Sequence, residues 1–266
     1  MIADNPTAAL RSSLRPMTAW AGATVVLFVG AYAIVAFAAG PREAALVALL
    51  TMTAWVGMAS PLISAAAPSA WAAFFRAGIV ADAVGLALLA LWGAGAADPR
   101  ETASLRFVTA AKIYCIIAAM TLFGWAAGRI GKTAAGRFIS AIAAAVAMGA
   151  MLTTPLWTGG LLANLPLAAR QQAVAAAVWV NPVYSIASAS AEELHFVWHQ
   201  APVMYELTRI GDIISPPPVA WWSAAVAYAG LAALAAAVTC CVRRRRESPG
   251  SVPTGGQTPA APGRDG

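Results

Sequence analysis

Charged residues are scarce in this chain of 266 residues, of which only 11% are Asp, Glu, Lys or Arg. A water-soluble domain keeps roughly a quarter of its residues charged, because its surface must stay hydrated. Hydrophobic residues make up 60% of the chain and its mean hydropathy is +0.70, so it cannot cover a soluble globule with polar surface. The composition excludes a water-soluble domain and predicts an all-α polytopic membrane protein in contact with membrane lipid.

Histidine and cysteine are nearly absent, at two and three residues respectively. The cysteines lie inside or beside apolar runs, which argues against a disulfide framework, and no histidine lies in an apolar run to ligate haem. Neither a Gly-x-Ser-x-Gly elbow nor a Ser/His pairing in these runs indicates an intramembrane protease. The net charge of +6 comes from basic residues at the ends of apolar runs, which does not indicate nucleic-acid binding.

Long apolar runs, in contrast, are abundant. A helix needs about 20 apolar residues to cross a hydrocarbon core of about 30 Å, and six runs meet this length. The first is longer than the apolar core of a signal peptide, so we expect a retained helix. The predicted spans are at about residues 17–39, 44–66, 71–97, 107–128, 138–158 and 219–242, between an N-terminal segment at 1–16 and a tail at 243–266 that we expect to be disordered.

Residues 160–191 are apolar but carry Asn181-Pro182, and proline removes a backbone donor and bends a helix. Six spans put nine Lys and Arg residues on the inner side and five on the outer side, whereas a seventh span through 173–191 gives eight and six. The positive-inside rule therefore favours six spans with both termini cytoplasmic. We expect an outer re-entrant or interfacial hairpin at 160–191, packed against protein, and an outer loop at 192–218.

Both histidines of the chain lie in one short stretch, "AEELHFVWHQAP", at residues 191–202. On a helix, Glu192, His195 and His199 share one face, which is the spacing of a metal half-site. The aromatic and apolar residues between them suit an amphipathic helix that lies in the membrane interface. We favour the interfacial helix, expect no cofactor and no enzymatic activity, and keep the three residues as metal candidates.

Two charges interrupt the third and fourth apolar runs at depth, Asp82 and Lys112. At about 1.5 Å of helix rise per residue, the depths of the two residues in the membrane differ by about 6 Å, which a flexible lysine side chain can bridge. Because an unpaired charge inside a membrane is costly, we expect an Asp82–Lys112 pair that acts as a structural clasp. Arg76 lies close enough to the inner surface for its guanidinium to reach the interface.

Residues 126–133, "AAGRIGKT", loosely fit a phosphate-binding loop with alanine in place of the first glycine. That motif requires a preceding strand and an enclosing nucleotide-binding domain. Here an apolar run precedes it and the next one follows at once. We interpret the stretch as a basic cytoplasmic loop, so the chain does not hydrolyse ATP by itself.

A family resemblance is present between residues 155 and 242. Leu165-Pro166 is followed by Asn181-Pro182-Val183-Tyr184 within "PLWTGGLLANLPLAARQQAVAAAVWVNPVYSIASA" at residues 155–189. This stretch resembles the permease domain of type-2 ABC exporters, whose hairpin between the fifth and sixth spans often carries Leu-Pro and then Asn-Pro-hydrophobic-aromatic. The resemblance implies a dimeric permease, with itself or a related chain, in the cell (inner) membrane, driven by a separate ATP-binding subunit.

The segment between the second and third spans departs from that family. Such permeases usually carry a Glu/Arg-rich segment with Gly-Thr-Leu there, which couples to the ATPase, whereas this chain has only "APSAWAAFFRAG" at 67–78. A degenerate permease, one half of a split system, and a protein with this architecture but no transport all remain open.

Three functions are therefore compatible with the sequence. The first is the permease subunit of an ABC-type exporter, with the loop 129–137 and Arg76 as contacts for the ATPase. The second is a non-transporting scaffold of an envelope complex, in which the loop 192–218 docks a partner. The third is a metal-dependent membrane enzyme that uses Glu192, His195 and His199.

Overall fold

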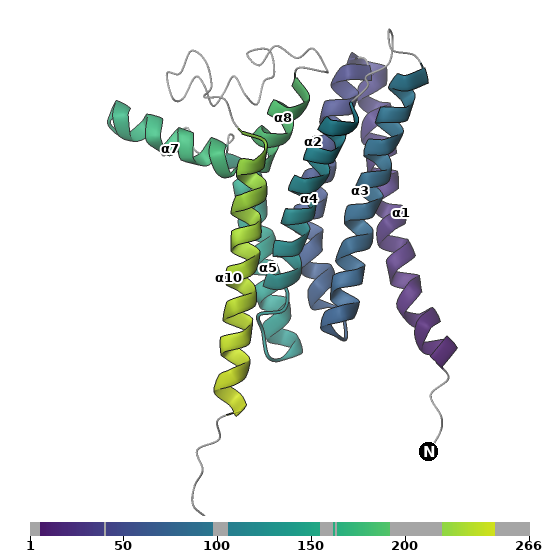
Figure 1. Cartoon of the computed structure of the whole chain (residues 1–266), viewed down its shortest axis with the longest axis vertical. Helices are drawn as coiled ribbons and strands as arrows, with labels where there is room; N and C mark the ends of the chain where they lie inside the picture. Colours follow the sequence, from purple (N-terminus) through teal and green to yellow (C-terminus); the bar gives the residue numbers. More distant parts are fainter. Residues whose placement is uncertain are drawn as a thin grey trace, which may run out of the picture.

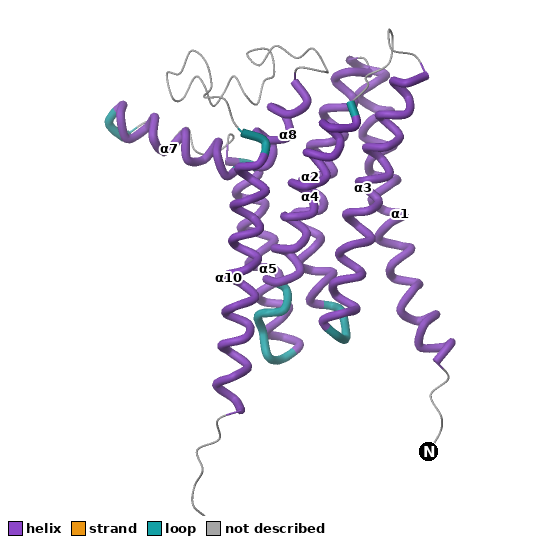
Figure 2. The backbone as a smooth tube through the Cα atoms, in the orientation of Figure 1, coloured by secondary structure: helices purple, strands orange, loops and turns teal. Residues whose placement is uncertain are grey.

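The computed structural model describes residues 6–39, 41–97, 106–154, 162, 164–191 and 220–247, and every regular element among them is an α-helix (Figures 1 and 2). Six of these helices are long and apolar enough to cross a membrane, which confirms the predicted fold class. They are α1 (Pro6–Ala39), α2 (Pro41–Ala65), α3 (Ala70–Ala97), α4 (Phe107–Ala127), α5 (Ala134–Leu152) and α10 (Trp222–Glu247). Two shorter helices, α7 (Leu167–Val180) and α8 (Pro182–Ala191), lie between the fifth and sixth spans.

The helix ends differ from the ends of the apolar runs. α1 begins at Pro6, because proline suits the first helical position and the alanine, leucine and arginine that follow are good helix formers. α10 continues through its four arginines to Glu247, so residues 243–247 are helical and not part of a disordered tail. Basic residues also stabilise the carboxyl end of a helix through its dipole. The remaining tail, from residue 248, lies outside the described residues.

α5 ends at Leu152, six residues before the end of the predicted span at 138–158. It begins at Ala134 because the Thr133 hydroxyl accepts a hydrogen bond from the Gly136 N–H, at 3.0 Å. It ends at Leu152, where the Thr153 hydroxyl donates back to the Gly149 carbonyl at 2.8 Å. Pro155 follows within a turn of the helix, and proline cannot continue one.

Both described chain ends lie at one end of the bundle (Figure 1). The start of α1, the turn at 66–69, the turn at 128–133 and the last residues of α10 gather there, and we call it the basic end because of the arginines and lysine that it carries. α7 and α8 lie at the opposite end, which we call the hairpin end. Successive helices therefore run in opposite directions between the two ends, as six consecutive membrane crossings require (Figure 1).

The core is built around α4, which packs against α2, α3 and α10. The side chains of Ile113, Ile116, Ile117 and Met120 are fully buried there. Outward-facing positions carry large apolar side chains such as Phe37, which is 96% exposed. In a membrane these side chains meet lipid tails, so the bundle is held by interhelical packing and not by exclusion of water.

Small residues bring α4 close to α2, as the many alanines and glycines in the spans predict. A Cβ atom added to Gly124 would lie 2.8 Å from the Cβ of Ser60 and 3.0 Å from the Cδ of Pro61. One added to Gly128 would overlap the carbonyl oxygen of Pro61. The two glycines form a Gly-x-x-x-Gly face, which allows the backbones of two helices to approach closely.

Candidate functional site

The hairpin at 160–191 is the first candidate site, and its two described arms are α7 and α8. Their axes are bent by 73° where they meet at Asn181. Both arms lie at the hairpin end of the bundle, and α7 extends sideways from it (Figure 1). α8 contacts α2, α4 and α10, and α7 contacts α10. The predicted kink at Asn181-Pro182 is present, and the second arm is packed against protein.

Asn181 fixes this bend through both ends of its side-chain amide. Its Nδ2 donates to the carbonyl oxygen of Met151 in the last turn of α5, at 2.8 Å. Its Oδ1 accepts from the Val183 N–H, at 2.9 Å, and thereby caps the start of α8. The side chain is completely buried. One residue therefore ties the end of the fifth span to the tip of the hairpin.

Pro182 explains why the break falls at this point. The Asn181 N–H makes the last α7 bond, to Ala177 at 3.0 Å, and the following residue has no N–H to continue the helix. Proline is favoured as the first residue of a new helix, where its missing donor is not needed. The Asn-Pro pair therefore both ends α7 and starts α8.

Buried polar groups lie on α8 and on the facing part of α10, and of these only Tyr184 belongs to a motif that the sequence indicates. The hydroxyls of Ser185 and Ser223 lie 3.5 Å apart and link α8 to α10. Tyr184 and Tyr228 are each 1% exposed, and their hydroxyls have no hydrogen-bond partner among the described residues. Ser185, Ser223 and Tyr228 are single residues within alanine-rich helices and give no pattern, so only the packing of the helices brings them together with Tyr184.

The basic end was predicted to supply ATPase contacts from 129–137 and Arg76. No comparison or contact tests this prediction. In the structure Arg129 is buried, at 8% exposed, and its Nη1 donates to the Ala67 carbonyl at 3.0 Å. Arg76 is half-buried and its Nη1 lies 3.5 Å from the Ala66 carbonyl. These two arginines therefore bind the turn between α2 and α3, and Lys132 is the exposed cation of the 128–133 turn.

Replacing Arg129 with alanine is expected to lower the free energy of unfolding by about 1–3 kcal/mol, because a buried carbonyl loses a charged donor. Lys132→Ala is the matched control, since Lys132 is exposed and should change stability by less than about 0.5 kcal/mol. Both variants are compared by unfolding of the purified protein in mixed detergent and SDS. Equal stability of Arg129→Ala and the native chain would contradict a structural role for this arginine.

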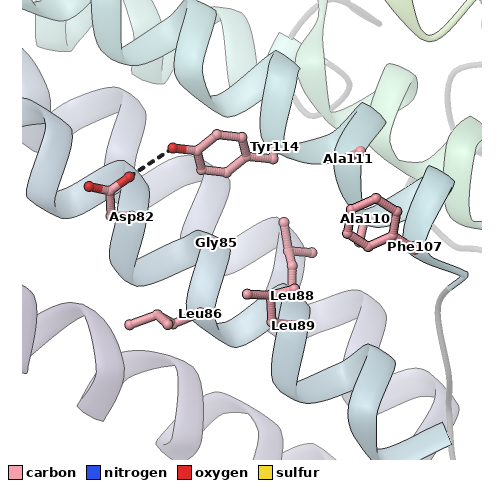
Figure 3. A pocket seen from close by; sticks show the side chains of 9 residues that line it. All are labelled: Asp82, Gly85, Leu86, Leu88, Leu89, Phe107, Ala110, Ala111 and Tyr114. Atoms are coloured by element: carbon pink, nitrogen blue, oxygen red, sulfur yellow. Dashed lines mark hydrogen bonds between the residues drawn. The ribbon is translucent and has the colours of Figure 1, made fainter. Parts of the chain in front are cut away.

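Asp82 does not form the predicted clasp with Lys112. Its Oδ1 accepts a hydrogen bond from the hydroxyl of Tyr114 on α4, at 2.8 Å (Figure 3). Among the described residues no ion pair joins Asp82 to Lys112. The carboxylate is exposed on the surface of the bundle, and Lys112 is half-buried.

The register of α3 against α4 explains why the clasp fails. A Cβ on Gly85 would lie 3.0 Å from the ring of Tyr114, and the rings of Trp92 and Phe107 lie 6.0 Å apart. This register places Lys112 about 7 Å nearer the hairpin end than the carboxylate. Lys112 also lies about 160° around α4 from Tyr114, at 100° per residue. The depths of Asp82 and Lys112 in the membrane would allow an ion pair, but Lys112 lies on a different side of α4 from the residue that faces Asp82.

The metal candidates Glu192, His195 and His199 lie outside the described residues, and so does the loop 192–218 that contains them. Within the described parts of the chain, no group of three His, Cys, Asp or Glu side chains could hold a metal ion. The metal site at Glu192, His195 and His199 therefore stays a prediction from the sequence.

Comparison with known proteins found no match: neither a family model, nor a curated protein, nor a solved structure matches this chain. What the fold defines is an all-α multi-pass membrane protein with six candidate spans and a bent helix pair between the last two.

Proposed function

We propose that this chain is the permease-like membrane subunit of an export system driven by a separate ATP-binding subunit. The observation that supports it most is the bent pair α7 and α8, which stands between the fifth and sixth spans and carries the Asn-Pro motif at its tip. Its position and its tie to α5 through Asn181 agree with the hairpin that the family resemblance implies. In an exporter of this type, the hairpin forms part of the gate on the outer side.

The orientation of the chain follows from its charges. The basic end carries the four arginines of α10 together with Arg129, Lys132 and Arg137. Cytoplasmic loops carry an excess of basic residues, so we assign the basic end to the cytoplasm and the hairpin end to the outer side of the cell (inner) membrane. Both termini are then cytoplasmic.

One feature favours a second function, that of a non-transporting scaffold. Only residues 66–69 connect α2 to α3, and this short turn is held to α4 by Arg129. Type-2 permeases usually have a longer coupling segment at this place. If the chain binds an ATPase, the contact must come from elsewhere on the basic end, and Lys132 is the exposed cation of the other described turn.

Co-purification distinguishes the two functions. The full chain is purified in mild detergent from its native membranes, and we expect an ATP-binding protein with a phosphate-loop motif to accompany it in a defined ratio. Lys132→Glu should lower that ratio several-fold, because it reverses the exposed charge at the contact. Arg106→Glu is the control, since it reverses a charge on an exposed residue at the hairpin end. Reproducible purification without an ATPase would favour the scaffold.

A further inference from the structure

A pocket opens on the side of the bundle between α3 and α4, with a volume of about 460 Å³. Its wall is apolar, with Leu86 and Leu89 on one side and Phe107 on the other (Figure 3). At one end lies the Asp82 carboxylate, held by the Tyr114 hydroxyl. Pockets of about 300–1,000 Å³ with few polar groups are typical of small-molecule sites.

The depth of Asp82 makes this carboxylate unusual. It lies twelve residues from the start of the candidate span Ala70–Gly93, which is about 18 Å along the helix and close to the middle of the bilayer. Asp82 is nonetheless exposed on the surface of the bundle that meets lipid. Ionisable groups within a membrane normally face the bundle interior or a partner, because a charge in hydrocarbon costs several kcal/mol.

No basic side chain in the described part of the chain forms an ion pair with the Asp82 carboxyl group. Tyr114 supplies one hydrogen bond from a neutral hydroxyl. The basic residues within the described membrane-spanning segments are Arg76, Lys112 and Arg137, and none of them forms an ion pair with Asp82. The pocket is therefore an apolar cavity of ligand size, and no basic side chain of the described residues pairs with the carboxyl group at its end.

We propose that this pocket binds a lipophilic organic cation, whose charge lies against Asp82 while its hydrocarbon body fills the space between Leu86, Leu89 and Phe107. If two hydrophobic ions have the same shape and opposite charge, the α3–α4 pocket should therefore bind the cation and not the anion. The proposal depends on this pocket alone and holds whether the chain is a permease or a scaffold.

Two other occupants fit less well. A phospholipid keeps its headgroup at the interface, so only its uncharged tails would reach the depth of Asp82. A second copy of the chain would need a cation at mid-depth on its outer surface. Within the described spans the only basic side chains are Arg76 and Arg137, both near the basic end, and Lys112, and all three are half-buried.

The test uses tetraphenylphosphonium and tetraphenylborate, which have nearly the same shape and opposite charge. Each is titrated, in radiolabelled form, onto the full chain in nanodiscs of neutral phosphatidylcholine, with empty nanodiscs as the blank. We expect saturable binding of tetraphenylphosphonium, and at least tenfold weaker binding of tetraphenylborate.

The variants separate charge from shape. Asp82→Asn should weaken tetraphenylphosphonium binding at least tenfold, because it removes the charge but keeps an oxygen that can accept from Tyr114. Asp82→Glu should stay within a few-fold of the native chain. Leu86→Trp should block the cation by filling the pocket, whereas Leu234→Trp, on an exposed face of α10, should not.

Three results would overturn the proposal. They are the absence of saturable cation binding to the native chain, equal binding by Asp82→Asn, and equal binding of the two ions. Each variant is first checked for an unchanged unfolding midpoint, and Leu86→Trp tests the pocket independently if Asp82→Asn does not fold. None of these results depends on the presence of an ATPase.

Discussion

Gly128→Ala is expected to lower the free energy of unfolding by about 2–3 kcal/mol, one of the largest losses for a single methyl group in this chain. The added Cβ would overlap the backbone carbonyl oxygen of Pro61 and lie 2.9 Å from the Cβ of Ser64. A carbonyl in a helix cannot rotate away, so α2 and α4 must separate. Their contact then loses van der Waals energy along its length, and packing of this kind is what holds helices together in lipid.

The need for glycine at this position comes from proximity and not from backbone conformation. Gly128 has φ −66° and ψ −7°, values that any residue adopts. Gly230→Ala is the matched control, because an added Cβ there meets nothing within 4 Å. It should be neutral or stabilising by up to about 1 kcal/mol, since alanine is the better helix former.

Unfolding of both variants is followed in mixed detergent and SDS. Gly124→Ala should also destabilise, but less than Gly128→Ala, because the side chain of Ser60 can rotate in part while the Pro61 carbonyl cannot. If Gly128→Ala and Gly230→Ala had the same stability, the close approach of α2 and α4 would be wrong.

The sequence predicted the six spans well because span length and apolarity are properties of single segments. The bend at Asn181-Pro182 was predictable for the same reason, since proline acts on its own helix. The ends of the helices were less predictable. Arg243 to Arg246 were expected to end the last helix, but charge limits only the span, and arginine is a good helix former.

The contacts between helices could not be predicted from the sequence in the same way. The expected Asp82–Lys112 pair used depth but not the direction of each side chain around its helix. Tyr114, the actual partner, belongs to an i, i+3, i+4, i+7 face of α4 with Phe107. That face could have been recognised only if the register of α3 against α4 had been known.

Asn181→Leu is expected to lower the free energy of unfolding by about 2–3 kcal/mol, because a completely buried side chain loses its two hydrogen bonds to the backbone. The Val183 N–H loses its acceptor at 2.9 Å, whereas the Met151 carbonyl loses the donor at 2.8 Å but still accepts from the Thr154 hydroxyl. An unsatisfied buried group costs about 1–3 kcal/mol. Leucine has the same branching at Cγ as asparagine and leaves no cavity, but it is bulkier, so some overpacking adds to the loss of the hydrogen bonds.

Asn164→Leu is the control, because Asn164 is exposed and belongs to the same hairpin. Its stability should stay within about 0.5 kcal/mol of the native chain in the same SDS titration. A native-like free energy for Asn181→Leu would mean that Asn181 does not tie the hairpin to α5.

Asn181→Ser separates the two roles of this side chain. Serine is a good N-cap and can accept from the Val183 N–H, but it is too short to reach the Met151 carbonyl as well. We therefore expect about half the loss of Asn181→Leu, in the form of an intact α8 that is no longer tied to the fifth span. Limited proteolysis at the hairpin end should then increase while the unfolding midpoint falls only in part. If Asn181→Ser were as unstable as Asn181→Leu, the bond to Met151 would carry the whole effect, and the cap on α8 would contribute little.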